Sequence, residues 1–130
     1  MRFLVILLLL AMVSCDPVTI YHQKMVNNTE YTIVGSINNY PDTVLTETVI
    51  IAPHSTQTLS TMNDISQVSQ YQNCPNYTSF VFSVQDNDSL EVDLNIDNPD
   101  EWVFKENSRS KVSGGGECTC EITLEESQVH

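Results

Sequence analysis

Positive charge is scarce in this sequence. Lysine and arginine together number 5, against 17 aspartates and glutamates, and the formal net charge of the 130 residues is −12. Nucleic acids and anionic lipid headgroups are bound through clustered Lys and Arg side chains, and a strongly acidic surface repels both. The composition therefore excludes nucleic acid as a partner. It favours partners that carry basic patches, or glycans bridged by cations.

The sequence also lacks an apolar run long enough to cross a bilayer. The longest run covers residues 3–13, whereas a membrane-spanning helix needs about 20 apolar residues. Arg2 precedes this run and the small residue Ser14 follows it, so residues 1–14 have the pattern of a secretory signal peptide.

A cysteine stands directly after this segment. Residues 12–15 (Met-Val-Ser-Cys) resemble the lipobox of bacterial lipoproteins, in which a peptidase cuts before a diacylglyceryl cysteine; Met12 stands where Leu is commoner. The resemblance predicts that residues 1–14 are removed and that acyl chains on Cys15 hold the protein on a membrane. The alternative is an ordinary signal peptide with a cysteine near its cleavage site.

Glycine (4) and proline (5) are also few, and we find no internal repeat. Residues 15–130 are enough for one domain with its own core. Its Thr, Ser, Asn and Gln side chains, mixed with many Val and Ile, favour strands and turns. We divide the chain into a signal peptide (1–14), a lipidated N-terminus with a tether and first strand (15–29), and the rest of a single β-sandwich domain (30–130).

Short segments in which apolar and polar residues alternate predict the strands. They are residues 18–22, 31–37, 48–52, 55–59, 80–84, 90–96, 102–104 and 117–124. Residues 60–77 show neither the period of two that is typical of a strand nor the period of 3.6 that is typical of a helix, which predicts a long loop. Alternation on both sides of a turn at 85–88 predicts an antiparallel hairpin over residues 80–96. We therefore expect an all-β fold, a small antiparallel β-sandwich.

Three further cysteines allow several arrangements. Cys118 and Cys120 share one face of the last predicted strand, about 6.5 Å apart, and are poorly oriented to bond each other. Either of them forms a disulfide with Cys74 in an oxidising envelope compartment, or both are core thiols that pack as small apolar groups. A metal site is the least favoured interpretation.

We recognise no catalytic constellation, and we predict neither enzymatic activity nor a bound cofactor or metal. A nucleophile pair of Cys74 and His54 is conceivable because catalytic partners need only meet in space, but nothing near either residue supports it. The acidic segments 86–91 and 97–101 offer oxygens to Ca²⁺. However, Asp and Asn are also the residues that tight turns prefer.

Four short motifs occur along the chain: residues 27–31 (NNTEY), 51–56 (IAPHST), 88–90 with 96–98 (DSL and IDN), and 120–126 (CEITLEE). They are similar to segments of small uncharacterised lipoproteins of Bacteroidetes with a single β-sandwich domain. The resemblance implies an immunoglobulin-like or transthyretin-like sandwich on an envelope membrane, with no assigned activity. Gly often stands where this chain has His54. Aromatic residues usually replace the cysteines of the last strand, so no disulfide state is implied.

We therefore expect a lipid-anchored accessory module of the bacterial cell envelope, either binding or structural. Its partners are the membrane, through the lipid anchor, and a protein or glycan. We expect it on the outer membrane, on the periplasmic face or at the surface. The alternatives are an envelope thiol or metal buffer that uses Cys118 and Cys120, a calcium-binding protein, and an enzyme built on Cys74 and His54.

Overall fold

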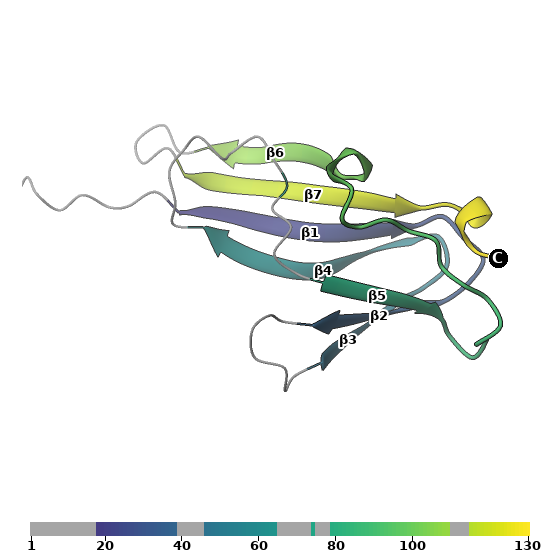
Figure 1. Cartoon of the computed structure of the whole chain (residues 1–130). Helices are drawn as coiled ribbons and strands as arrows, with labels where there is room; N and C mark the ends of the chain where they lie inside the picture. The colour runs from purple at the N-terminus through teal and green to yellow at the C-terminus, as the bar shows by residue number, and fades with distance from the viewer. Residues whose placement is uncertain (1–17, 39–45, 65–73, 75–78, 110–114) are drawn as a thin grey trace, which may run out of the picture.

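The described part of the chain folds into two β-sheets. The computed structural model describes residues 18–38, 46–64, 74, 79–109 and 115–130, so the expected signal peptide and Cys15 lie outside it. This part contains seven strands and two short 3₁₀ helices (Figure 1): β1 (Thr19–Asn27), β2 (Ile33–Asn38), β3 (Thr46–Ile51), β4 (Ser55–Asp64), β5 (Ser79–Val84), η2 (Pro99–Glu101), β6 (Val103–Arg109), β7 (Gly116–Leu124) and η3 (Glu126–Gln128). No α-helix occurs among the described residues. The predicted all-β class is confirmed.

The two sheets form the layers of a β-sandwich. One has four strands in the order β4-β1-β7-β6, and the other has three in the order β3-β2-β5 (Figure 1). The first and last strands run parallel, from Thr19 opposite Gly116 to Asn27 opposite Leu124. The other strand pairs of the two sheets are antiparallel, as expected, so this parallel pair is the exception to the expected antiparallel sandwich. Alternation predicts which face of a strand is buried, but it carries no information on which strand lies beside it.

β1 is longer than the predicted strand over residues 18–22. Every second side chain from Thr19 to Asn27 is buried, and the strand pairs with β4 on one side and β7 on the other. Three of its buried side chains, Thr19, Gln23 and Asn27, are polar. The Gln23 side chain accepts a hydrogen bond from the Ser60 hydroxyl at 2.7 Å. Because polar residues occupy inward positions, the alternation of apolar and polar residues stops partway along the strand. The sequence pattern therefore does not reveal the second half of β1.

The main core lies between the two sheets. Its buried members are Met25, Ile33, Ile51, Leu59, Phe80, Val84, Ile96, Ile122 and Leu124. Complete burial of such a side chain contributes about 1.5–3 kcal/mol. Gly35 lies opposite Phe82 in the β2–β5 pair, and a Cβ atom there would be 3.0 Å from the Phe82 ring. The missing side chain therefore lets the ring lie across β2.

Residues 90–96 do not form the second strand of a hairpin, which corrects that prediction. Their alternation is real, since Ile96 is buried and Leu90, Val92 and Leu94 are partly buried against the main core. The backbone, however, pairs with the C-terminus: the amides of Glu91 and Asp93 donate to the carbonyls of His130 (2.7 Å) and Gln128 (2.8 Å). The segment crosses from the three-stranded sheet to the four-stranded sheet (Figure 1). The turn after β5 does not fold it back onto β5.

The expected loop over residues 60–77 begins later than predicted, because β4 continues to Asp64. In the β1–β4 pair, Gln23 lies opposite Ser60 and Lys24 opposite Thr58, so one extra residue is inserted in β4. Such a bulge breaks the period of two and hides the rest of the strand. Residues 65–73 and 75–78 lie outside the described residues.

The sandwich has two distinct ends (Figure 1). At the Val18 end, β1 and β7 begin and β4 and β6 terminate. At the turn end lie the connections between β1 and β2 (residues 28–32) and between β3 and β4 (52–54), the turn after β5 (85–89), and the C-terminal residues 125–130.

Asn27 ties two connections of the turn end together. Its side chain is fully buried. Its amide nitrogen donates to the carbonyls of Tyr31 (2.8 Å), Ile51 (3.3 Å) and Ala52 (3.1 Å). Its oxygen accepts from the Thr29 amide (3.1 Å) and hydroxyl (2.7 Å). One amide group therefore satisfies backbone atoms of both the β1–β2 and the β3–β4 connections.

We predict that Asn27→Ala lowers the free energy of unfolding by about 3 kcal/mol, because several buried polar groups lose their partner at once. Equilibrium urea denaturation measures the change. Asn28→Ala is the matched control: the Asn28 side chain makes only an exposed bond to Glu125, at 2.8 Å, and its loss costs less than about 1 kcal/mol. Equal losses in the two variants would contradict this role of Asn27.

Candidate functional site

A disulfide joins Cys74 to Cys120, across 46 residues of sequence, with the two Cα atoms 5.6 Å apart. Cys120 lies on the inner face of β7, where it is fully buried. Of the arrangements that the sequence left open, the structure therefore contains one disulfide and one core thiol, Cys118. The bond fastens the chain between β4 and β5 to the middle of the four-stranded sheet.

Cys118 lies in a second, smaller core beside the disulfide. This core also contains the buried Tyr21 and Cys120, with Met62, Cys74, Trp102 and Phe104 packed against it. The Cys118 thiol donates a weak hydrogen bond to the Ile20 carbonyl, with a sulfur–oxygen distance of 3.6 Å. Burial, and secondarily the negative charge of Glu106, raises the pKa of the Cys118 thiol to about 11. Because the thiolate is the reactive and metal-binding form, this raised pKa lowers the reactivity of Cys118 at neutral pH.

The structure does not bring His54 to Cys74. The sulfur of Cys74 is bonded to Cys120. Cys120 lies four residues before Leu124 in β7. Leu124 and Ser55 are at the same level of the sheet, because both lie opposite Asn27 of β1. At about 3.3 Å per residue, Ser55 and Cys120 are roughly 13 Å apart along the strands, and His54 lies one residue beyond Ser55. Cys74 has no free thiol in this bond, so the pair lacks the nucleophile that it would need.

His54 belongs instead to the acidic turn end. Its backbone has a positive φ of 51°, the left-handed region that favours glycine. Its Nε2 lies 3.0 Å from a carboxylate oxygen of Glu30. A carboxylate oxygen of Glu126 in turn accepts a hydrogen bond from the Glu30 amide at 3.0 Å. The β1–β2 connection, the β3–β4 connection and the C-terminus thus meet around Glu30.

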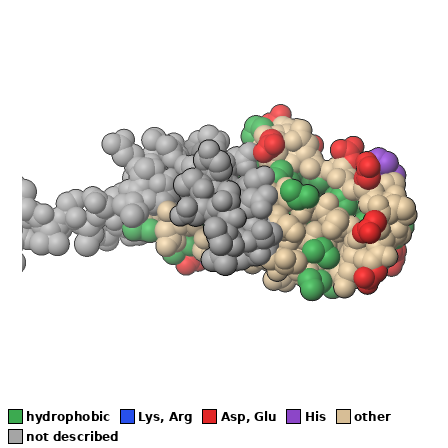
Figure 2. Space-filling model, turned by 60° about the horizontal axis from the view of Figure 1, so that its bottom comes forward, with side chains coloured by type: hydrophobic (Ala, Val, Ile, Leu, Met, Phe, Trp, Pro, Cys, Tyr) green, Lys and Arg blue, Asp and Glu red, His purple; other side chains and the backbone are tan. Residues whose placement is uncertain are grey.

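Negative charge accumulates at the turn end. Figure 2 shows Asp and Glu side chains gathered toward this end, with a His among them. The acidic residues of its segments are Glu30, Asp86, Asp88, Glu125 and Glu126, and Lys and Arg are absent from all four segments. The sequence did not reveal this cluster because its members come from three separate parts of the chain. Its strong negative field attracts cations and basic surfaces.

The Asp- and Asn-rich segments considered for calcium are built as turns. The Asn87 side-chain oxygen accepts from the Ser89 amide (3.3 Å) and hydroxyl (2.6 Å). The Asn98 oxygen accepts from the Asp100 amide (3.1 Å) and caps η2. These bonds are the turn chemistry for which Asn is favoured. Within the described ranges, no group of three or more His, Cys, Asp or Glu residues is placed to hold a metal ion.

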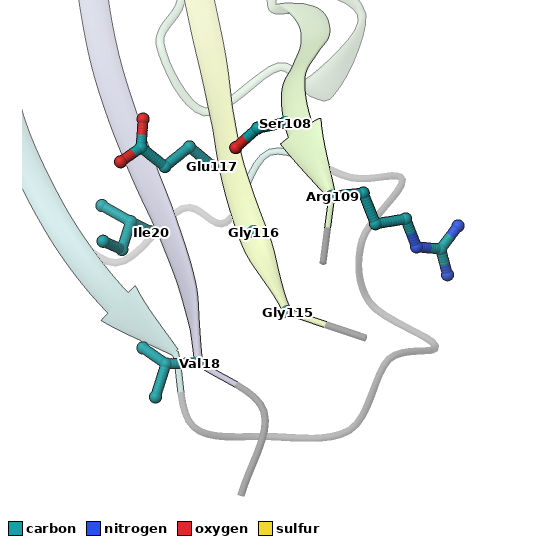
Figure 3. A pocket seen from close by; sticks show the side chains of 7 residues that line it. All are labelled: Val18, Ile20, Ser108, Arg109, Gly115, Gly116 and Glu117. Atoms are coloured by element: carbon teal, nitrogen blue, oxygen red, sulfur yellow. The ribbon is translucent and has the colours of Figure 1, made fainter. Parts of the chain in front are cut away.

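One shallow hollow lies at the Val18 end, with a volume of about 490 Å³. Its lining comes from the starts of β1 and β7 and the end of β6: Val18, Ile20, Ser108, Arg109, Gly115, Gly116 and Glu117 (Figure 3). In the part of the chain that the structure describes, no helix is long and apolar enough to span a bilayer.

No protein-family model, curated protein or solved structure matches this chain.

We predict that the Cys74–Cys120 bond contributes about 2–4 kcal/mol to the free energy of unfolding, because it closes a loop of 46 residues in the unfolded chain. Chemical denaturation with and without reductant measures the contribution. Cys118→Ser should remain sensitive to reductant, and Cys74→Ser should be insensitive. If Cys118→Ser loses the sensitivity instead, Cys74 is paired with Cys118 and the pairing described here is wrong.

The raised pKa of Cys118 predicts a loss of stability at alkaline pH. Between its ordinary value of 9.0 and its folded value of about 11, the unfolded thiol ionises while the folded thiol keeps its proton. The free energy of unfolding therefore falls as pH rises through this window, by at most about 3 kcal/mol. Thermal unfolding across the window, compared with Cys118→Ala, measures the slope due to the thiol. Identical slopes in the two proteins would refute the prediction.

Proposed function

We propose that this chain is a lipid-anchored module of the bacterial cell envelope, held on the membrane by acyl chains on Cys15, and that its role is binding or structural. One observation carries the proposal: the lipobox-like residues 12–15 end four residues before Thr19, the first residue of β1. Cleavage before Cys15 would therefore remove the apolar segment and leave every described strand intact.

The proposed binding face is the turn end. Its carboxylates come from the β1–β2 connection, the turn after β5 and the C-terminal residues. The scaffold that carries them is fixed by the Asn27 network and the disulfide. This acidic surface is suited to a partner with a basic patch, or to a glycan bridged by cations, because complementary charge speeds association and excludes unlike partners. Recognition of a partner by its charge is the role proposed for this surface.

We further propose that the sandwich is of the immunoglobulin-like or transthyretin-like type, on the outer membrane and facing the periplasm. Seven strands in two packed sheets support this type. The oxidising periplasm suits a disulfide such as Cys74–Cys120.

The anchor is tested by expressing the full chain in a bacterial host and floating the isolated membranes on a density gradient. The full chain should float with the membranes and carry an acyl mass, and Cys15→Ser should carry no acyl mass and keep residues 1–14, because one residue carries all the acyl chains and the peptidase cuts before the acylated cysteine. Cys118→Ala is the matched control, since it removes a cysteine that is not lipidated. An acyl mass on Cys15→Ser, or failure of the full chain to float, would refute the proposal.

A further inference from the structure

We propose that the domain stands upright on the bilayer, with the Val18 end against the lipid headgroups and the turn end directed away from the membrane. The inference rests on the proposed lipid anchor at Cys15. It adds an orientation, a membrane-contacting surface and a partner, the headgroup layer itself.

The length of chain between the anchor and the fold is the first argument. Only residues 16 and 17 separate Cys15 from Val18. Three consecutive Cα–Cα steps of about 3.8 Å reach at most about 11 Å. The acyl chains hold Cys15 at the membrane surface, so Val18 lies within that distance of it. The anchor therefore cannot hold the domain clear of the bilayer, and the Val18 end is the part that meets the headgroups.

The surface at this end suits the headgroup layer. Val18 is 43% exposed, and with Ile20 it forms an aliphatic wall of the hollow, while Arg109 extends to the other side (Figure 3). Aliphatic side chains combined with a long basic side chain are what a membrane interface accommodates.

Gly115 keeps this end of the sheet closely packed. The Gly116 amide donates to the Val18 carbonyl at 3.1 Å, and a Cβ atom on Gly115 would be 2.2 Å from the Val18 carbonyl oxygen. β1 and β7 therefore start side by side, and the short tether leaves directly from a paired strand.

The distribution of charge is the second argument. At the Val18 end Arg109 offsets Glu117, while Asp16 of the tether and Asp64, which lies opposite Thr19, add negative charge. The turn end carries more negative charge, since its segments contain the five acidic residues Glu30, Asp86, Asp88, Glu125 and Glu126 and neither Lys nor Arg. The nine residues of β1 separate the two ends by roughly 30 Å, several times the Debye length of about 8 Å at physiological salt. An upright domain keeps the acidic end beyond the field of anionic headgroups.

A domain that lies on one of its two sheets does not keep the acidic turn end away from the headgroups. The outer face of the three-stranded sheet exposes Ile50 and Val81, so it offers apolar contact to a bilayer. A domain lying on that face, or on the four-stranded sheet, would place the carboxylates of the turn end near the headgroups. The repulsion that the upright pose avoids would then act at full strength.

Two positions on β4 distinguish these poses. Thr56 and Asn63 are both exposed, and they face outward on the same strand because they lie opposite Val26 and Ile20. Thr56 is near the turn end and Asn63 is near the Val18 end, roughly 23 Å apart along the strand. Thr56→Trp and Asn63→Trp, each made in a Trp102→Phe background, report the distance of these positions from the membrane.

The experiment uses the full lipidated protein in vesicles of phosphatidylethanolamine and phosphatidylglycerol that contain a headgroup-attached spin label. We expect the label to quench Asn63→Trp several-fold more strongly than Thr56→Trp. Equal quenching of the two, strong or weak, would overturn the upright orientation. Stronger quenching of Thr56→Trp would overturn it as well.

Flotation of the same vesicles separates the two proposals. If the protein floats but quenching is equal, the anchor stands and the orientation fails; if the protein does not float, both fail.

A second measurement covers the case in which Trp102→Phe folds poorly, since Trp102 donates a hydrogen bond to the Ile96 carbonyl at 2.8 Å. It uses nitroxide labels on Asn63→Cys and Thr56→Cys. Accessibility to a water-soluble relaxant should then be several-fold lower at position 63. Equal accessibility would again overturn the orientation.

Discussion

The position of β1 is the constraint on which the rest of the structure depends. This strand lies between β4 and β7 and is paired with both from Thr19 to Asn27, so the four-stranded sheet cannot form without it. It supplies Tyr21 to the smaller core and Met25 to the main core. At its far end, Asn27 ties the two turn-end connections together through buried hydrogen bonds.

The same strand begins only a few residues after the proposed anchor, Cys15. A tether of two residues that ended in a loop would leave the domain free to reorient. Here it ends in a strand with hydrogen-bonded neighbours on both sides, and the C-terminal strand β7 begins at the same end. The proposed orientation at the membrane and the stability of the fold therefore depend on the same backbone pairs.

The sequence predicted the faces of strands well and their partners poorly. The inward residues of β7, from Cys118 to Leu124, and those of β5, from Phe80 to Val84, follow the predicted alternation. The partner of residues 90–96 did not follow from alternation, because an extended segment with one apolar face packs equally well beside the C-terminus or beside β5. The parallel β1–β7 pair was hidden for the same reason, since it joins the two ends of the described chain.

Side-chain chemistry was predictable only where it is local. The Asn-rich turns are recognisable because Asn bonds its own backbone two residues later, as Asn87 and Asn98 do. The disulfide partner of Cys74 depends on how the chain between β4 and β5 meets the sheet, and Cys118 and Cys120 share one face. The acidic cluster around Glu30 likewise exists only after three connections meet. The acyl chains on Cys15 and the upright pose remain proposals.

The intact mass of the protein extracted from bacterial membranes under non-reducing conditions tests the central claim most directly. The account predicts the mass of residues 15–130 plus a diacylglyceryl group. It also predicts one internal disulfide, and alkylation of Cys118 only after unfolding. An unacylated chain, or three thiols that react in the folded protein, would contradict it.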